Sequence, residues 1–184
     1  MKMTLLAAVL VALMAGGAGF VKKRCPEKQY RLLMKILLIP YALIVVYLSV
    51  LQRSVNPDSP VVLLPGSVIF RTLGWDAYSL SDLGQLFQGM LSRDAFDWPG
   101  LHILLQNILA YMPLGFLVQE GFGPIRGKWI LLIGAGFSLA MEMSQLIFRL
   151  GWFETDDLIL NILGSWLGSR MSVNKKRIMA EQAK

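Results

Sequence analysis

The feature that most constrains this chain is a series of long apolar runs that hold almost no charge. A helix that crosses the hydrocarbon core of a bilayer needs about 20 mostly apolar residues. Residues 3–21 form an uncharged run, and further apolar runs follow at residues 36–51, 101–118, 129–148 and 158–171. In the whole chain 55% of residues are hydrophobic and 16% are charged, against about 25% charged in soluble domains. We therefore predict an all-α, polytopic transmembrane helical bundle of about five spans.

The first run has a second interpretation. Lys2, the apolar stretch after it and the small residues at 15–19 also fit a secretory signal peptide. The second run extends back to residue 32, because the long side chains of Arg31 and Lys35 reach the interface from within a span. Residues 1–21 are therefore either a retained span or a cleaved leader.

The distribution of basic residues predicts the orientation. Six Lys and Arg residues lie at 22–35, two at 121–128 and five from residue 170 onward, whereas most acidic residues lie in the alternate connections. Basic connections stay in the cytoplasm. We predict a multi-pass protein of the cell membrane with an extracytoplasmic N-terminus and a cytoplasmic C-terminus. The net charge of +6 is then a topology signal and does not indicate a nucleic-acid partner.

Metal and disulfide chemistry have little support in the sequence. Cys25 is the one cysteine, which excludes an internal disulfide and a cysteine-based zinc site. His102 is the one histidine, so no metal site is expected around it. We expect no metal and no cofactor, and we expect Cys25 to stay reduced in the cytoplasm.

One long connection, residues 52–100, is expected outside the cytoplasm. Within it, residues 80–90 place apolar side chains at helical spacing, and Ser79 and Asp82 fit the cap of a helix start. The connection also carries aromatic residues of the types that favour the headgroup region, which are Trp75, Tyr78 and Trp98. We predict an interfacial amphipathic helix at this position.

The chain divides into three parts along its length. Residues 1–100 hold two transmembrane helices and the extracytoplasmic connection. Residues 101–171 form a three-helix core, and residues 172–184 form a basic cytoplasmic tail.

Polar residues inside the last three spans are the main functional signal. A charged side chain in the middle of a span, such as Glu142, costs at least about 2.5 kcal/mol unless it faces a polar partner or cavity. The polar residues follow the helical repeat, so that each span carries them on one face. These faces consist of Asn107 and Tyr111, of Ser138, Glu142, Gln145 and Arg149, and of Asp157, Asn161, Gly164 and Gly168. The two glycines would let a neighbouring helix approach closely.

These faces predict a polar cavity that opens to the extracytoplasmic side. At about 1.5 Å per residue, their polar groups lie at a similar depth below the ends of the spans. The candidate ligand-binding residues are Asn107, Tyr111, Glu142, Gln145, Arg149, Asp156, Asp157 and Asn161. Structural explanations stay open, because such groups also hydrogen-bond between helices and because carboxylates at 156 and 157 stabilise a helix N-terminus.

The same faces contain motifs that resemble a known family. The motifs are Asn107-x3-Tyr111-x-Pro-Leu-Gly-Phe, Ser138-Leu-x2-Glu142-x2-Gln145 and Asp156-Asp157-Leu-Ile-Leu-Asn161-x2-Gly164-x3-Gly168. Together they are similar to the VanZ-like family of integral membrane proteins, over about residues 101–170. The resemblance implies a helical membrane protein related to a factor in low-level teicoplanin resistance, without an established reaction. The chain departs from the family pattern at Glu154, where Asp is usual, and at Arg149, which lies farther upstream.

Three functions compete at this stage. The first is a binding or accessory factor whose cavity engages a cell-envelope lipid or a lipid-linked glycan precursor. The second is an intramembrane enzyme that acts on such a substrate with Glu142 as general base. The third, a transporter, is disfavoured because the chain shows no internal repeat and its polar faces are confined to one leaflet.

Overall fold

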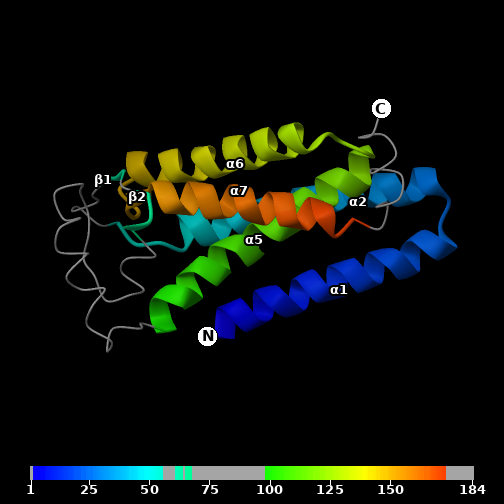
Figure 1. The fold of residues 1–184 in the computed structure, drawn as a ribbon, viewed down its shortest axis with the longest axis horizontal. Coiled ribbons are helices and arrows are strands. Elements are labelled where there is room, and N and C mark those ends of the chain that lie inside the picture. Colours follow the sequence, from blue (N-terminus) through cyan, green and yellow to red (C-terminus); the bar gives the residue numbers. More distant parts are fainter. Residues whose placement is uncertain (1, 56–60, 64, 68–97, 173–184) are drawn as a thin grey trace.

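Long helices make up most of the computed structural model, which describes residues 2–55, 61–63, 65–67 and 98–172 (Figure 1). The helices are α1 (Lys2–Arg24), α2 (Glu27–Val46), α5 (Trp98–Phe122), α6 (Gly127–Ile147) and α7 (Thr155–Arg170). A π-helical turn, Tyr47–Leu51, continues α2. The ribbon shows that α1, α5 and α7 run in one direction along the bundle and that α2 and α6 run in the other.

Prolines and glycines set the helix ends. α1 stops at Arg24 and α2 starts at Glu27, because Pro26 lacks an N–H and its ring disfavours a helical conformation in the residue before it. α5 ends beside Gly123, whose φ is 89°, a left-handed conformation that glycine adopts without steric cost. Pro40 and Pro113 lie inside α2 and α5, which continue through them.

The predicted apolar runs coincide with these helices. The largest difference is at α2, which begins at Glu27 although the apolar run begins at residue 36, because backbone hydrogen bonds do not require apolar side chains. Among the described residues, Glu27–Leu51 and Gly127–Ile147 are long and apolar enough to cross a membrane. Large apolar side chains on both helices are exposed on the outside of the bundle, among them Ile39, Leu43, Leu132 and Ile147.

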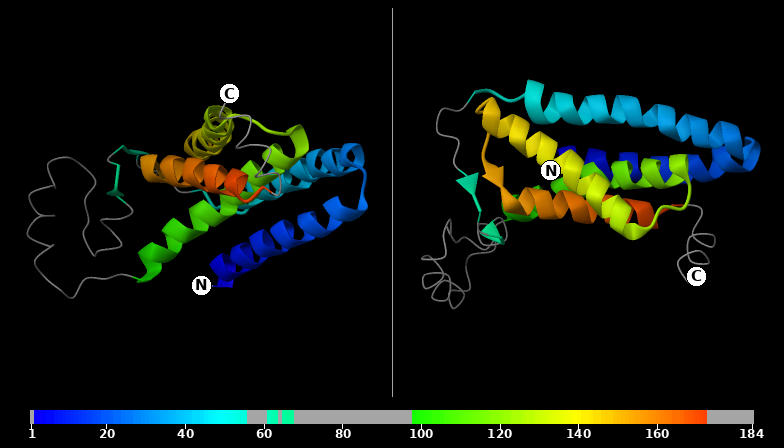
Figure 2. Two further views of the ribbon diagram at one scale, coloured as in Figure 1. Left: turned by 45° about the vertical axis from the view of Figure 1, so that its right-hand side comes forward. Right: turned by 90° about the horizontal axis from the view of Figure 1, so that it is seen from above.

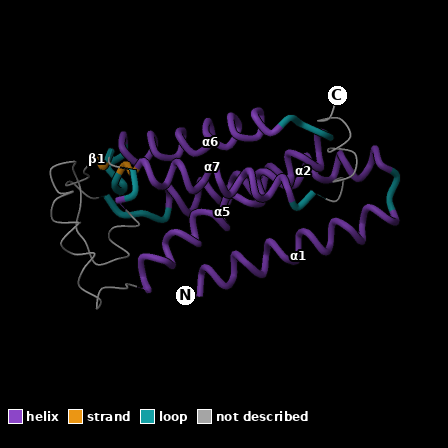
Figure 3. Tube along the Cα trace, in the orientation of Figure 1, coloured by secondary structure: helices purple, strands orange, loops and turns teal. Residues whose placement is uncertain are grey.

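α5 lies at the centre of the bundle and contacts each of the other four long helices. Figures 2 and 3 show α1 and α6 on opposite sides of α5 and α7. The residues of α5 from 113 to 121 are all buried. Two apolar clusters lie on this segment, one with Phe116 and Leu117 facing α1 and α2, and one with Leu114 and Val118 facing α6.

Glycines allow α5 and α7 to pack with their backbones in contact. A Cβ atom at Gly164 would overlap the backbone of Ile108, and one at Gly168 would overlap the carbonyl of Met112. Gly115 makes the reciprocal approach, against the carbonyl of Ser165. The predicted close approach at Gly164 and Gly168 is confirmed, and its partner is α5.

A short pair of strands departs from the all-α prediction. β1 (Val61–Val62) pairs in parallel with β2 (Phe153–Glu154). Two-residue strands are too short to leave a periodic pattern in the sequence, so this pairing could not be predicted. It places part of the long connection against the segment that joins α6 to α7. The predicted amphipathic helix at 80–90 and the tail from 173 onward lie outside the described residues.

Candidate functional site

The connection from α6 to α7 gathers polar side chains at one end of the bundle. The last turns of α6 carry Glu142 and Gln145, and the first turn of α7 carries Asp156 and Asp157. The close α5–α7 contact brings Asn107 of α5 to the same end. We call this group the polar cluster, and it consists of Arg53, Asn107, Ser138, Glu142, Gln145, Glu154, Asp156, Asp157 and Asn161.

Two amides join the helices of the polar cluster. Asn107 Nδ2 donates to Asp157 Oδ1 at 2.5 Å, which links α5 to α7. Asn161 Nδ2 donates to Ser138 Oγ at 2.9 Å, which links α7 to α6. Asn161 is buried, and its Oδ1 has no hydrogen-bond partner among the described residues. The cluster therefore contains a buried acceptor with unused hydrogen-bonding capacity.

Glu142 is the deepest carboxylate of the polar cluster. Glu142 is 3% exposed. Its Oε2 accepts a long hydrogen bond of 3.4 Å from the backbone N–H of Glu154. The charges of Asp157, Glu154 and Arg53 all act on this carboxylate. Several acids and one guanidinium thus share a small volume at this end of the bundle.

Arg53 is the residue of this group that the sequence analysis missed. It follows the end of the second helix, and its Nη1 donates to Gln145 Oε1 at 3.3 Å. A Cβ atom at Gly151 would lie 2.5 Å from the same Nη1, so Gly151 leaves the space that the guanidinium occupies. The one signal in the sequence was its place on the extracytoplasmic side of the predicted topology. Its contact with Gln145 depends on how the π-helical turn at Tyr47–Leu51 packs against α6.

The remaining predicted residues are Asp156, Tyr111 and Arg149, and each has its own set of contacts. Asp156 is buried, and it accepts hydrogen bonds from Gly66 N at 2.5 Å and from Ser67 Oγ at 3.1 Å, so it holds the long connection in place. Tyr111 is buried with its ring centroid 5.9 Å from that of Phe137, and its hydroxyl shares a hydrogen bond with Ser138 of the polar cluster. Arg149 is exposed and has a φ of 54°.

Arg149 forms the end of α6. Its N–H bonds to Leu146 O at 3.2 Å and the next N–H, of Leu150, bonds to Gln145 O at 2.8 Å. This is a left-handed helix cap of the kind that usually carries glycine. The structure thus brings most predicted residues to one end of the bundle and gives Arg149 a backbone role there.

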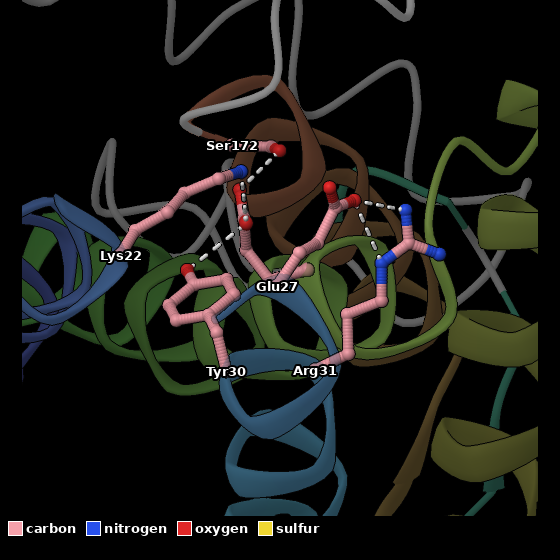
Figure 4. Close-up of polar contacts among 6 residues, drawn as sticks. Lys22, Glu27, Tyr30, Arg31 and Ser172 are labelled. Atoms are coloured by element: carbon pink, nitrogen blue, oxygen red, sulfur yellow. Dashed lines mark hydrogen bonds and ion pairs between the residues drawn. The ribbon is translucent and has the colours of Figure 1, made fainter. Parts of the chain in front are cut away.

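Another buried carboxylate, that of Glu120, lies near the end of α5, at the opposite end of the bundle from the polar cluster. Figure 4 shows Lys22, Tyr30 and Ser172 around it. Glu120 is fully buried. Its Oε2 accepts a hydrogen bond from Tyr30 Oη at 2.9 Å and forms an ion pair with Lys22 Nζ at 3.4 Å. Its Oε1 accepts a hydrogen bond from Ser172 Oγ. We call these four residues the Glu120 cluster, which joins α1, α2, α5 and the end of α7. The sequence analysis missed it, although an acid next to three strongly basic connections was a visible signal.

The side chains that could bind a metal ion are those of His, Cys, Asp and Glu. Within the described ranges, no group of three or more His, Cys, Asp or Glu side chains is arranged to hold a metal ion. The polar cluster offers hydrogen bonds and charge from its carboxylates, amides and guanidinium.

Comparison with known proteins places this geometry in context. The family model described as VanZ/LLP1 matches residues 32–174. The match covers α2 through α7 and so extends well before the motifs at 101–170. No curated protein and no solved structure matches the chain.

Proposed function

The chain belongs to the VanZ/LLP1 family, and from this premise we propose that it binds a cell-envelope lipid or a lipid-linked glycan precursor through the polar cluster. The observation that carries the proposal is the convergence of Asn107, Glu142 and Asn161, from three different helices, with Arg53 at one end of an apolar bundle. Family membership and the two apolar helices indicate a membrane protein.

The chemistry of the polar cluster suits the head of an amphiphile. Carboxylates and amides hydrogen-bond to sugar hydroxyls, and a guanidinium binds phosphate oxygens in pairs. The unused Asn161 Oδ1 would accept a hydrogen bond from such a head group. The exposed apolar side chains of α2 and α6 would leave the acyl chains in surrounding lipid. A lipid would then place its head group in the polar cluster and keep its tails in the bilayer, beside the apolar side chains of α2 and α6.

The orientation in this proposal is extracytoplasmic for the polar cluster. The basic residues that end α1 and the basic turn between α5 and α6 lie at the other end of the bundle (Figure 1). Positive segments stay in the cytoplasm, which puts the cluster in the outer leaflet. A multi-pass topology with the N-terminus outside and the C-terminus inside follows from the same reasoning.

Lipid retention tests the binding proposal directly. The protein is purified in a mild detergent from native membranes, and co-purified lipids are identified by mass spectrometry. We expect one envelope lipid to be enriched over its share of the membrane, and Arg53→Gln to lower that enrichment severalfold. Met143→Leu is the control, because Met143 is an exposed apolar residue of α6. Co-purified lipids that match the bulk membrane in wild type would disprove the proposal.

The link to teicoplanin belongs to the same proposal. A protein that binds an envelope lipid changes how much of that lipid is free at the outer surface, where a glycopeptide acts. We expect expression of the wild-type chain to raise teicoplanin tolerance and Arg53→Gln to abolish the increase. An unchanged inhibitory concentration for both would remove the drug link and leave lipid binding intact.

An intramembrane enzyme is the second candidate. The observation that favours it is the burial of Glu142 beside Asp157 and Arg53, because paired acids in a dry site act as general acid and base. An enzyme would convert the co-purified lipid over time, and Glu142→Gln would stop the conversion while leaving the lipid bound. A binding factor would leave the lipid unchanged in both proteins.

A further inference from the structure

The polar side chains of the lipid site proposed above are covered. Glu142, Gln145 and Asn161 are 3%, 4% and 5% exposed. Arg53 is exposed and lies at the edge of the polar cluster, where it donates to Gln145. A lipid head group therefore reaches the buried carboxylate and amides only if an element that covers them moves.

The helices around the polar cluster are packed too tightly to be that element. A Cβ atom at Gly164 would overlap the backbone of Ile108, so α7 lies directly on α5. A Cβ atom at Gly134 would lie 2.8 Å from Ser165 Oγ, so α6 also packs closely on α7. Helices in such contact separate only when packing along their whole length is lost.

A short segment of the long connection also lies at the polar cluster. We call it the strap, and it consists of residues 61–63 and 65–67. β1, at its start, pairs with β2, so that Val62 lies beside Glu154, and the backbone N–H of Glu154 donates to Glu142. Figures 1 and 2 show β1 at the end of the bundle where α6 ends and α7 begins. The strap therefore lies against the segment that donates to Glu142.

The carboxylate of Asp156 fastens the other end of the strap. Its two oxygens accept hydrogen bonds from Gly66 N at 2.5 Å and from Ser67 Oγ at 3.1 Å. Val62 is buried, but Leu63 is 65% exposed, so the strap buries little apolar surface. A segment that is held mainly by hydrogen bonds opens at a lower free energy than a packed helix. Of the described elements around the polar cluster, the strap is the one that opens most easily.

We propose that the strap is a lid that lifts to admit the lipid head group to the polar cluster, and that Asp156 is the latch that closes it. This inference rests on the proposed function only for the identity of what passes under the lid. Asp156 is then a positioning residue and does not contact the lipid. Because the latch holds the strap with or without a lipid in the polar cluster, a weaker latch raises the open population of both forms.

Thiol labelling measures the opening without any lipid. In a Cys25→Ser background, Gln145→Cys puts a reporter on a buried position of the polar cluster, and a water-soluble maleimide is added to protein purified in detergent. We expect Asp156→Asn to raise the labelling rate severalfold and Asp156→Ala to raise it further, because Asn keeps one acceptor oxygen. Ser67→Ala removes one donor to the latch and should also raise the rate. An unchanged rate in folded Asp156→Ala would overturn the proposal, and if that variant does not fold, unchanged rates in Asp156→Asn and Ser67→Ala would do so.

Matched controls separate a lifted strap from a loosened bundle. Ser165→Cys puts the reporter at a fully buried position between α6 and α7 and should stay unlabelled in every variant. Ser54→Cys is exposed and should be labelled at one rate in every variant. Glu27→Gln makes the same change from acid to amide at an exposed position of α2 and should leave the labelling rate of Gln145→Cys unchanged. Labelling of Ser165→Cys in the Asp156→Asn protein would assign the effect to the whole bundle and overturn the proposal.

Lipid retention distinguishes this inference from the proposed function. A looser latch speeds entry and exit of the lipid by the same factor, so Asp156→Asn should retain the wild-type amount of lipid at equilibrium. Less lipid on folded Asp156→Asn would make Asp156 a ligand contact and overturn the latch. Wild-type protein without an enriched lipid would disprove the proposed function, whereas the labelling rates would still decide whether the strap opens.

Discussion

Two of the buried carboxylates, those of Glu120 and Glu142, have surroundings that differ in kind. Glu120 receives a hydroxyl on each oxygen and an ammonium from Lys22. Within the described part of the chain, Glu142 accepts one long hydrogen bond, from a backbone N–H, and the charges of other acids act on it. A carboxylate with a full set of donors contributes to stability, whereas one with spare capacity is available to a ligand. This difference supports a structural role for Glu120, and it is consistent with the ligand role that we propose for Glu142.

Substitution at Glu120 tests the structural role. The Glu120→Leu variant removes the acceptor that Tyr30, Lys22 and Ser172 share. We expect the free energy of unfolding to fall by about 3–5 kcal/mol, as for other broken buried pairs. In Glu120→Gln a neutral acceptor remains, so the loss should be smaller, about 1.5–3 kcal/mol. Chemical unfolding in detergent measures both. Equal stability of Glu120→Leu and wild type would contradict the role.

A substitution at Arg149 tests whether its left-handed backbone conformation lowers the stability of the protein. A non-glycine residue in the left-handed region costs about 1 kcal/mol, and the φ of Arg149 is 54°. We expect Arg149→Gly to raise the free energy of unfolding by up to about 1 kcal/mol and to leave lipid retention unchanged, because the side chain is exposed. A drop in lipid retention would instead show that the guanidinium contacts the ligand, as the sequence analysis proposed.

At the scale of elements, the contact between α5 and α7 positions the polar cluster. Backbone contact at Gly164 and Gly168 leaves α7 no freedom to move along or around α5. That register brings Asp157 to Asn107 and turns Asn161 toward α6. Gly164 and Gly168 thus position the polar cluster although they are not part of it, because membrane helices pack closely only where side chains are small.

A pair of alanine substitutions with opposite expected signs tests this contact. Gly168→Ala places a Cβ on the carbonyl of Met112, and overpacking of this kind costs about 1–3 kcal/mol. Gly136→Ala meets nothing within 4 Å and should gain up to about 1 kcal/mol from helix propensity. Thermal unfolding in detergent compares the two. A Gly168→Ala protein as stable as Gly136→Ala would mean that α5 and α7 are not in backbone contact.

At the scale of the whole molecule, charge separates the two ends of the bundle. Acidic and amide side chains gather where α6 meets α7, and Lys and Arg gather where α1 meets α2 and where α5 meets α6. The positive-inside rule translates this asymmetry into an orientation. The lipid site that we propose takes its leaflet from that orientation, with the polar cluster on the outer side.

Cysteine labelling tests the orientation. In a Cys25→Ser background, single cysteines are introduced as Gln29→Cys, at the basic end, and as Ser54→Cys, beside Arg53; both positions are exposed. A membrane-impermeant maleimide added to intact cells should label Ser54→Cys alone, and lysis should make Gln29→Cys reactive. The reverse pattern would invert the topology and the leaflet that we propose for the polar cluster. The mass of the purified chain shows in the same experiment whether residues 1–21 are retained.

Local patterns in the sequence determined the helices and their faces. The apolar runs predicted where the long helices lie, because burial in lipid and backbone hydrogen bonding act on each segment separately. Helical spacing placed Glu142 with Gln145 and Asp157 with Asn161, and Gly164 with Gly168 predicted a tight helix contact. The sequence also identified the polar helix faces that meet at one end.

Only the tertiary structure decided which side chains are partners. Arg53 with Gln145, Glu120 with Tyr30, and Val62 with Glu154 are each about 90 residues apart or more, so their contact depends on the rotation and register of packed helices. No periodicity within one segment encodes that geometry. That geometry follows from how whole helices pack, as where Gly164 and Gly168 let the backbone of α7 contact that of α5, and a contact between backbones exists only once both helices are folded.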